Sequence, residues 1–287
     1  MTRLVYTSDL HGVLDLYRGA GEAALRLHAD ALIFGGDLCP GTPSAKSQWL
    51  PVQQPEFLLQ RLSPLLGEWK QAHPALRVFA IPGNDDCQTV LPAMEELEMK
   101  GLLENLHQKA RTLGAYTLVG LSFVPPTPFN LKDFERWDEG PEAMSDSYSY
   151  RGVMGTPRGF AVIDDFRSYL DSFPSLAQEL KRIPIIDPAH TVAVIHTPPF
   201  NTHCDVLFDG RHIGSRAVRS WIEKNHLRLT LHGHIHESPK LSRSFCDRIG
   251  STTVINPGCD HTRAHLVLVD LDNPSELEHS LYGKKNL

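Results

Sequence analysis

The stretch Leu4-Val5-Tyr6-Thr7-Ser8-Asp9-Leu10-His11 joins a short apolar run to a polar motif, and this arrangement recurs along the chain. Residues 31–34 and 78–81 are two further apolar runs, and continuous runs of this length are typical of strands covered on both faces. Apolar residues at helical spacing lie between the runs, at residues 14–25 and roughly 56–71. Strand, helix, strand, helix, strand is the pattern of a parallel sheet.

The pattern changes beyond Leu113, and the strand expected at residues 116–121 is assigned to a second sheet. Residues 122–190 are rich in proline and aromatic residues, with helical patterns near 164–170 and 175–181. The remaining expected elements are a helix at 215–224 and strands at 191–195, 227–231, 253–255, 265–271 and 277–282. We expect a single domain over residues 1–287 with an aromatic and proline-rich insert at about 122–190.

Composition excludes several classes of protein. Of the 287 residues 41% are apolar and 22% are charged, so the chain is able to bury a large core. The 28 Lys and Arg residues against 34 Asp and Glu residues give a net charge of −6, which argues against a protein that binds a nucleic-acid backbone. The five cysteines form no C-x-x-C pair, and the N-terminus lacks the apolar run of a signal peptide. Because no apolar run reaches 18 residues, we expect a cytoplasmic protein that does not enter membranes.

Five short polar motifs follow the carboxyl ends of expected strands, where ligands of open α/β sheets bind. Their carboxylates, carboxamide oxygen and imidazoles are groups that coordinate metal ions. Each motif alone is also typical of an ordinary turn or a buried histidine, but all five in this order predict a metal site. The five motifs are Asp9-Leu10-His11, Gly35-Gly36-Asp37, Gly83-Asn84-Asp85-Asp86, His196 and Gly233-His234-Ile235-His236.

The order of these motifs resembles that of the calcineurin-like metallophosphoesterase superfamily, whose pattern runs D-x-H, G-D, G-N-H-[DE], H, G-H-x-H. The resemblance extends from Asp9 to His236, and Asn256-Pro257-Gly258 is similar to the closing turn of that family. It implies a mixed α/β fold, a four-layer α/β/β/α sandwich of two mixed β-sheets flanked by helices.

The resemblance also implies a site for two divalent metal ions. One ion would be held by Asp9, His11 and His236, the other by Asn84, His196 and His234, and Asp37 would bridge them. The family uses manganese, iron, zinc or related ions, and a mixed Asp, Asn and His set suits such metals better than calcium or magnesium. A hydroxide bridging the ions would then attack a small phosphoester substrate, and no Ser or Cys nucleophile is required.

The third position of G-N-H-[DE] is Asp85 here instead of the His that in relatives lies near the leaving group. A carboxylate beside two cations is expected to have a depressed pKa, which makes Asp85 ionised and a poor proton donor. The added negative charge brings the formal charge of the site close to zero and favours a monoanionic phosphodiester over a dianionic monoester. In the alternative interpretation, Asp85 faces solvent or merely braces Asn84.

Two further residues are candidates for the role of the missing His. Arg211 and His212 precede the helix expected from Ser215, and exposed backbone N–H groups there would bind a phosphate. In the alternative interpretation Ser215 is an ordinary N-cap. The candidate catalytic residues are therefore Asp37, Asp85 and His212, and the candidate phosphate-binding residues are Asn84, Arg211 and His212.

Several alternatives stay open at the level of sequence. The insert at 122–190, with Trp137, Tyr148, Tyr150 and Arg151, is either a substrate-selecting cover over the site or a packing element that never touches a ligand. The favoured function is hydrolysis of phosphodiesters, including nucleotides. The rivals are a nuclease or phosphomonoesterase of the same fold, and a metal-bound scaffold that has lost turnover.

Overall fold

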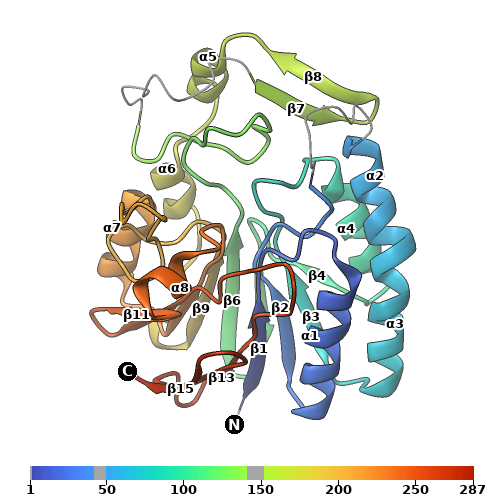
Figure 1. Cartoon of the computed structure of the whole chain (residues 1–287), viewed down its shortest axis with the longest axis vertical. Coiled ribbons are helices and arrows are strands. Elements are labelled where there is room, and N and C mark those ends of the chain that lie inside the picture. Colours follow the sequence, from blue (N-terminus) through green and yellow to red (C-terminus); the bar gives the residue numbers. More distant parts are fainter. Residues whose placement is uncertain (1, 42–49, 141–151) are drawn as a thin grey trace.

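A computed structural model of the protein describes residues 2–41, 50–140 and 152–287 (Figure 1). Its elements in chain order are β1 (Arg3–Thr7), α1 (Leu14–Arg26), β2 (Ala31–Phe34), α2 (Leu50–Glu56), the π-helical segment η1 (Phe57–Leu62), α3 (Ser63–Ala72), β3 (Arg77–Ala80), α4 (Val90–Met99), β4 (Glu104–Asn105), β5 (Ala110–Leu113), β6 (Tyr116–Leu121), β7 (Gly152–Thr156), β8 (Gly159–Ile163), α5 (Phe166–Asp171), α6 (Leu176–Lys181), the 3₁₀ turn η2 (Pro188–His190), β9 (Thr191–Ile195), α7 (Arg216–Asn225), β10 (Leu229–Leu231), α8 (Ser238–Ser242), β11 (Cys246–Ile249), β12 (Thr252–Ile255), β13 (Val267–Asp270), β14 (Glu276–His279) and β15 (Gly283–Asn286).

The first sheet has the strand order β15-β14-β13-β1-β2-β3-β4. β1, β2, β3 and β4 are parallel, while β13, β14 and β15 continue the sheet antiparallel from β1. The register pairs Thr7 with Phe34 and Phe34 with Ala80, so the carboxyl ends of β1, β2 and β3 are level. The loops that follow these strands therefore start side by side.

The second sheet has the order β11-β12-β10-β9-β6-β5. Its four central strands are parallel, and β11 and β5 are antiparallel edge strands. Val194 pairs with Leu231, and Leu231 pairs with Ile255, so the carboxyl ends of β9, β10 and β12 are also level.

Side chains of the central strands alternate between two apolar layers, as the two-residue period of a strand requires. Leu4 and Tyr6 of β1 face the interior between the two sheets, together with Val192 and Val194 of β9. Val5 faces the opposite way, toward the helices. Burying each of these aliphatic side chains stabilises the fold by about 1.5–3 kcal/mol.

Helices cover the outer face of each sheet, which confirms the expected four-layer architecture. Buried side chains of α1, η1, α3 and α4 pack on the first sheet, and those of α6 and α7 pack on the second. In Figure 1 the first set lies at the right and α6 and α7 lie at the left, with the strands between them.

The helix expected at 56–71 begins earlier, at Leu50, and is continuous through η1 to Ala72. Pro51 lies in the first turn, where the missing N–H of proline leaves no hydrogen bond unmade. Pro55 lies inside the helix, directly before the residue at which the sequence-based helix begins. The π-helical segment follows directly, and such segments re-register the backbone hydrogen bonds of a helix.

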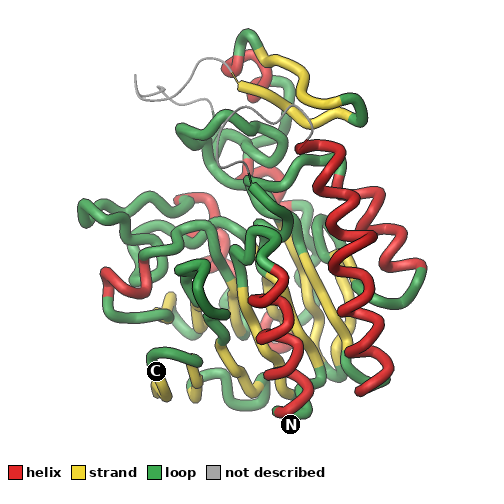
Figure 2. Tube along the Cα trace, turned by 45° about the vertical axis from the view of Figure 1, so that its right-hand side comes forward, coloured by secondary structure: helices red, strands yellow, loops and turns green. Residues whose placement is uncertain are grey.

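The insert contains an antiparallel hairpin, β7 and β8, followed by α5 and α6. The hairpin and α5 stand apart from the two sheets in both views, beyond the carboxyl ends of the parallel strands (Figures 1 and 2). Tyr148, Tyr150 and Arg151 lie outside the described residues.

Two buried aspartates of the insert bind the rest of the fold. Asp133 accepts hydrogen bonds from the backbone N–H groups of Gln88 and Gly155, and so joins the hairpin to the loop after β3. Asp138 accepts from the hydroxyl of Ser215 and the N–H of Arg216 at the start of α7. Among the described residues, no helix has the length and apolar character needed to cross a membrane.

Candidate metal centre

The level strand ends bring the predicted polar motifs to one edge of the two sheets. Three of the motifs follow strands of the first sheet, and two follow strands of the second. The structure brings together all seven predicted metal ligands, which are Asp9 and His11 after β1, Asp37 after β2, Asn84 after β3, His196 after β9, and His234 and His236 after β10.

Asp9, His11 and His236 form what we call the outer group. The Nε2 atom of His236 lies 3.3 Å from Oδ1 of Asp9 and 3.3 Å from Nε2 of His11. The donor atoms of these three residues and of Asp37 all lie within 4.8 Å of one another. Asp9 is fully buried, whereas 14% of the His11 side chain and 28% of the His236 side chain are exposed. Solvent therefore reaches this group from the histidine side.

Asn84, His196 and His234 form the inner group. The Oδ1 atom of Asn84 lies 3.1 Å from Nε2 of His196 and 2.6 Å from Nδ1 of His234. His196 and Asn84 are buried, and His234 is half-buried. Asp37 lies between the groups, because its Oδ2 atom is 3.4 Å from Nε2 of His196 and 3.8 Å from Nε2 of His11.

The backbone is strained where it delivers these side chains. Asp9, His11, Asp37 and His234 have φ values of 62°, 43°, 49° and 66°, in the left-handed region that residues with a side chain rarely adopt. Such conformations cost of order 1–3 kcal/mol each and are concentrated at functional sites.

Glycine permits the closest backbone approach to the carboxylates. A Cβ atom on Gly233 would collide with Oδ2 of Asp9, and one on Gly83 would collide with Oδ1 of Asp37. A larger residue at either position would therefore displace the carboxylate.

Hydrogen bonds around the groups fix the orientation of the donor atoms. The Nδ1 atom of His196 is 2.8 Å from the carbonyl oxygen of Gly35, a contact that places a proton on Nδ1 and leaves Nε2 facing Asn84 and Asp37. The amide nitrogen of Asn84 donates to Oδ1 of Asp85, so the Asn84 carbonyl oxygen faces the two imidazoles. The backbone N–H of His234 donates to the Asp9 carboxylate, and that of Asp85 donates to Asp37.

The charges of this cluster shift several pKa values. Burial alone raises the pKa of Asp9 and Asp37, but the neighbouring imidazoles overcome this effect and lower both pKa values. Burial lowers the pKa of His196 and His236, but Asp37 and Asp9 raise these pKa values to about 9. Burial and the charge of His196 lower the pKa of His234 to about 3. At neutral pH two protonated imidazoles therefore neutralise two buried carboxylates.

This donor set fits divalent cations. The carboxylates are ionised, the Asn84 oxygen faces inward, and imidazole nitrogens converge on both sides of Asp37. Protons on His196 and His236 supply the positive charge that cations would otherwise provide. The backbone lies so close to both carboxylates that it leaves no room for other side chains.

The model of the calcineurin-like phosphoesterase family matches residues 2–238, a range that includes every member of both groups. The chain belongs to the calcineurin-like phosphoesterase family. It is therefore related to hydrolases that act on phosphoester bonds with divalent metal ions. Among curated proteins, none matches the chain at a significant level.

Two solved structures have a similar fold over nearly the whole chain. One crystal structure has a TM-score of 0.61 at 15% identity and covers 96% of this chain and 98% of its own. The protein TT1561 of Thermus thermophilus has a TM-score of 0.59 at 15% identity, and the match covers 98% of this chain and 99% of TT1561. At this identity both show the fold alone.

Asp85 replaces the histidine of the phosphoesterase pattern, and in the metal-free protein its surroundings favour the neutral carboxyl group. Burial and the charges of Asp37 and Asp86 raise the pKa of Asp85 to about 7, whereas the depressed pKa predicted beside two bound cations stays a prediction. The protein's own groups thus oppose ionisation, and only cations would reverse the direction. Asp85 also braces Asn84 through the hydrogen bond described above, as the alternative interpretation predicted.

The predicted phosphate site before α7 required free backbone N–H groups, and this part of the prediction is wrong. Ser215 caps α7 by accepting from Val218, and Asp138 accepts from the N–H of Arg216, so the helix start already holds a carboxylate. His212 pairs with buried Asp205 at 2.7 Å.

The guanidinium of Arg211 pairs with Asp209, at 2.6 Å. Within residues 2–41, 50–140 and 152–287 no hydrogen bond or ion pair joins Arg211 or His212 to the outer or inner group. A role for either residue in phosphate binding or catalysis therefore stays a prediction.

Three further residues support the centre; Asn256 and Asp86 belong to motifs visible in the sequence, and only His261 was missed. Asn256 donates to the carbonyl oxygens of Gly233 and Ile235 and so fixes the loop that carries His234 and His236. Asp86 accepts from the N–H groups of Leu38 and Gly83, and so ties the loop after β2 to the loop after β3.

The third residue is His261, whose ring centroid is 5.0 Å from that of His11. The spacing of Asn256 after its strand was a usable signal. His261 has no such signal, because it lies in an irregular loop far along the chain.

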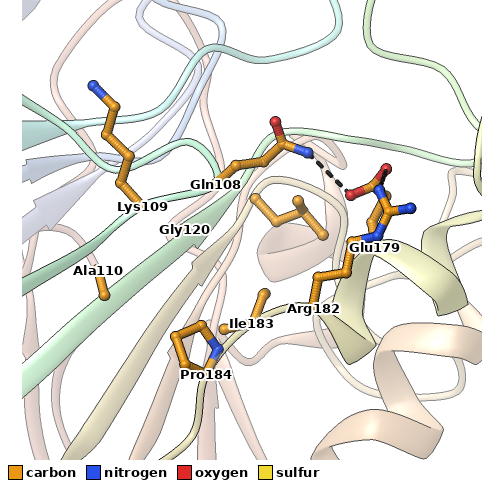
Figure 3. A pocket seen from close by; sticks show the side chains of 9 residues that line it. Gln108, Lys109, Ala110, Gly120, Glu179, Arg182, Ile183 and Pro184 are labelled. Carbon is orange, nitrogen blue, oxygen red and sulfur yellow. Dashed lines mark hydrogen bonds and ion pairs between the residues drawn. The ribbon is translucent and has the colours of Figure 1, made fainter.

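A separate cavity of about 300 Å³ lies beside β5, β6 and α6 (Figure 3). Gln108 donates to Glu179 across it, and Arg182 pairs with the same carboxylate. Its lining includes no member of the outer or inner group.

Proposed function

We propose that this chain is a binuclear metallophosphoesterase that hydrolyses small phosphodiesters, including nucleotide-type esters. The outer group with Asp37 would hold one divalent ion, and the inner group with Asp37 would hold the other. What carries the proposal is the position of Asp37, whose Oδ2 atom lies within 4 Å of imidazole nitrogens from both groups.

Two divalent ions held here would lower the pKa of a shared water, hold a phosphoryl group for in-line attack and neutralise charge on the attacking and leaving oxygens. The chain's own residues set the geometry for this chemistry. Asp37 would set the separation of the two sites, and buried Asp9 and His196 would supply donors on either side of it. Family membership supports a phosphoester substrate, and the net charge of −6 argues against a long nucleic acid.

The preference for a diester rests on Asp85. A carboxyl group is either neutral or negative, whereas the imidazole that it replaces is either neutral or positive. The Oδ2 atom of Asp85 lies 3.7 Å from Nδ1 of His11, so this difference in charge acts directly at the centre. The negative charge of Asp85 weakens binding of a dianionic phosphomonoester more than binding of a monoanionic phosphodiester, because Coulomb energy scales with the substrate charge.

The test compares a chromogenic phosphodiester with the matching phosphomonoester, using metal-free protein reloaded with Mn²⁺. The wild type is expected to turn over the diester with the higher kcat/KM. Asp85→His should lower the ratio of diester to monoester kcat/KM by about tenfold, equivalent to ~1.4 kcal/mol. Asp15→His, which changes an exposed aspartate on α1, is the matched control and should leave the ratio unchanged.

Two results would count against the proposal. A ratio that Asp85→His leaves unchanged, or loss of activity on both esters alike, would contradict the charge argument. Binding of two ions without turnover of either ester would favour the scaffold alternative.

A further inference from the structure

His261 places a third imidazole beside the outer group. Its ring centroid lies 5.0 Å from that of His11 and 5.4 Å from that of His236, in edge-on orientations. Nitrogen atoms of the three rings lie within 4.8 Å of one another, a spacing that can hold one metal ion. The seven ligands implied by the phosphoesterase pattern do not include His261.

The loop that carries His261 is bound to two members of the outer group. The thiol of Cys259 donates to the carbonyl oxygen of Asp9 at 3.0 Å, and the N–H of Cys259 donates to the carbonyl oxygen of His236 at 3.2 Å. Gly258 has φ 70°, and a Cβ atom there would lie 2.8 Å from the same His236 oxygen. The distance from His261 to the outer group is therefore set by the backbone, although the His261 side chain is exposed.

The backbone of His261 resembles that of two members of the outer group, and its ring contacts the thiol of Cys259. Its φ of 57° is unusual for a residue with a side chain, and Asp9 and His11 share this left-handed conformation. The Nδ1 atom lies 3.4 Å from the sulfur of Cys259, whose own proton is directed at Asp9. In the tautomer whose Nδ1–H donates to this sulfur, the lone pair is on Nε2, and a hydrogen bond on the far nitrogen is how proteins commonly orient metal-binding imidazoles.

We propose that His261 is an additional ligand of the ion held by the outer group. This inference rests on the proposed metal centre and extends it. The outer ion would have imidazole donors from His11, His236 and His261 and carboxylate donors from Asp9 and Asp37. Three imidazoles shift the preference of this site toward transition metals and away from magnesium, whereas the inner group retains two imidazoles and the Asn84 oxygen.

The test measures metal affinity instead of turnover. Metal-free wild type, His261→Ala and His261→Gln are titrated with Zn²⁺ by calorimetry, and the Co²⁺-loaded proteins are compared by visible absorption. His203→Ala is the matched control, because His203 is an exposed histidine paired with Asp247. We expect two ions in every protein, a dissociation constant raised about tenfold or more for one of them in both His261 variants, and a changed Co²⁺ spectrum.

The outcomes separate this inference from the proposed centre. If the wild type binds two ions and the His261 variants match it in both affinities and in spectrum, His261 is not a ligand, even if turnover falls. That last pattern would assign His261 to substrate contact instead. If the wild type binds fewer than two ions, the proposed binuclear centre fails and the inference fails with it. Thermal unfolding of the metal-free variants is the control that checks whether each one is folded.

Discussion

The outer and inner groups use similar donors in different surroundings. His196 of the inner group is fully buried, whereas 28% of the His236 side chain of the outer group is exposed, with the exposed ring of His261 beside it. The inner imidazoles converge on a neutral carboxamide oxygen, and the outer imidazoles lie near the carboxylate of Asp9. The difference suggests a division of roles. For the proposed centre, we expect the inner group to retain its ion more tightly and the outer group to be the one that solvent and substrate reach.

The strongest test of this comparison removes the residue that the two groups share. Asp37→Ala should weaken ion binding in both groups and lower kcat/KM by roughly 1,000-fold, because metal activation is worth several kcal/mol. Calorimetric titration with Mn²⁺ and steady-state kinetics measure the two effects. Asp15→Ala on α1 is the control. Loss of one ion with the other bound normally would mean that Asp37 belongs to one group and does not bridge.

The pH dependence of metal affinity tests both groups, since each one contains one imidazole with a raised pKa. Without metal, His196 and His236 have pKa values of about 9, above the ordinary 6.5. They therefore stabilise the metal-free fold fully below pH 6.5, and this contribution is lost as pH rises through about 9. Because an ion must displace the proton, the affinity of each group should rise about tenfold per pH unit below about pH 9 and level off above it.

Calorimetry at about pH 7.5 in buffers of different ionisation enthalpy measures this release directly. We expect about one proton per bound ion. Release of no protons would contradict the ion pairs described for His196 and His236. Release from one ion alone would confine the raised pKa to one group.

A smaller effect is expected from Asn256, which supports both groups through one loop. Asn256→Ala removes its hydrogen bonds to the carbonyl oxygens of Gly233 and Ile235. Mutation of a residue that supports metal ligands in this way typically lowers metal affinity about 10–100-fold. Both Zn²⁺ dissociation constants should rise within about that range, whereas His261→Ala should affect one. An effect of Asn256→Ala on one ion alone would show that the loop does not couple the groups.

Much of the fold and site was predictable because the signals were local. The apolar run at residues 31–34 is β2 as expected, and Ser215 is the N-cap that its position suggested. The ligand motifs were visible because each follows a strand, and parallel strands in register bring such ends together. Cytoplasmic location and the single-domain organisation stay predictions.

What escaped prediction depends on contacts between distant segments. The hairpin β7–β8 lacks a clear alternating pattern, and its strands are only partly buried. The N-terminus of α7 donates hydrogen bonds to Asp138, which belongs to the insert and is 77 residues away from Ser215 along the chain. The pKa of Asp85 depends on burial and on Asp37, neither of which its neighbours in sequence reveal.

Anomalous X-ray diffraction from crystals of the Mn²⁺-loaded protein would locate any bound ions relative to Asp37. We predict two anomalous peaks roughly 3.5–4 Å apart, one beside the outer group and one beside the inner group, with an oxygen of Asp37 bonded to both. A single peak, or two peaks that do not share Asp37, would contradict the binuclear centre proposed for this chain.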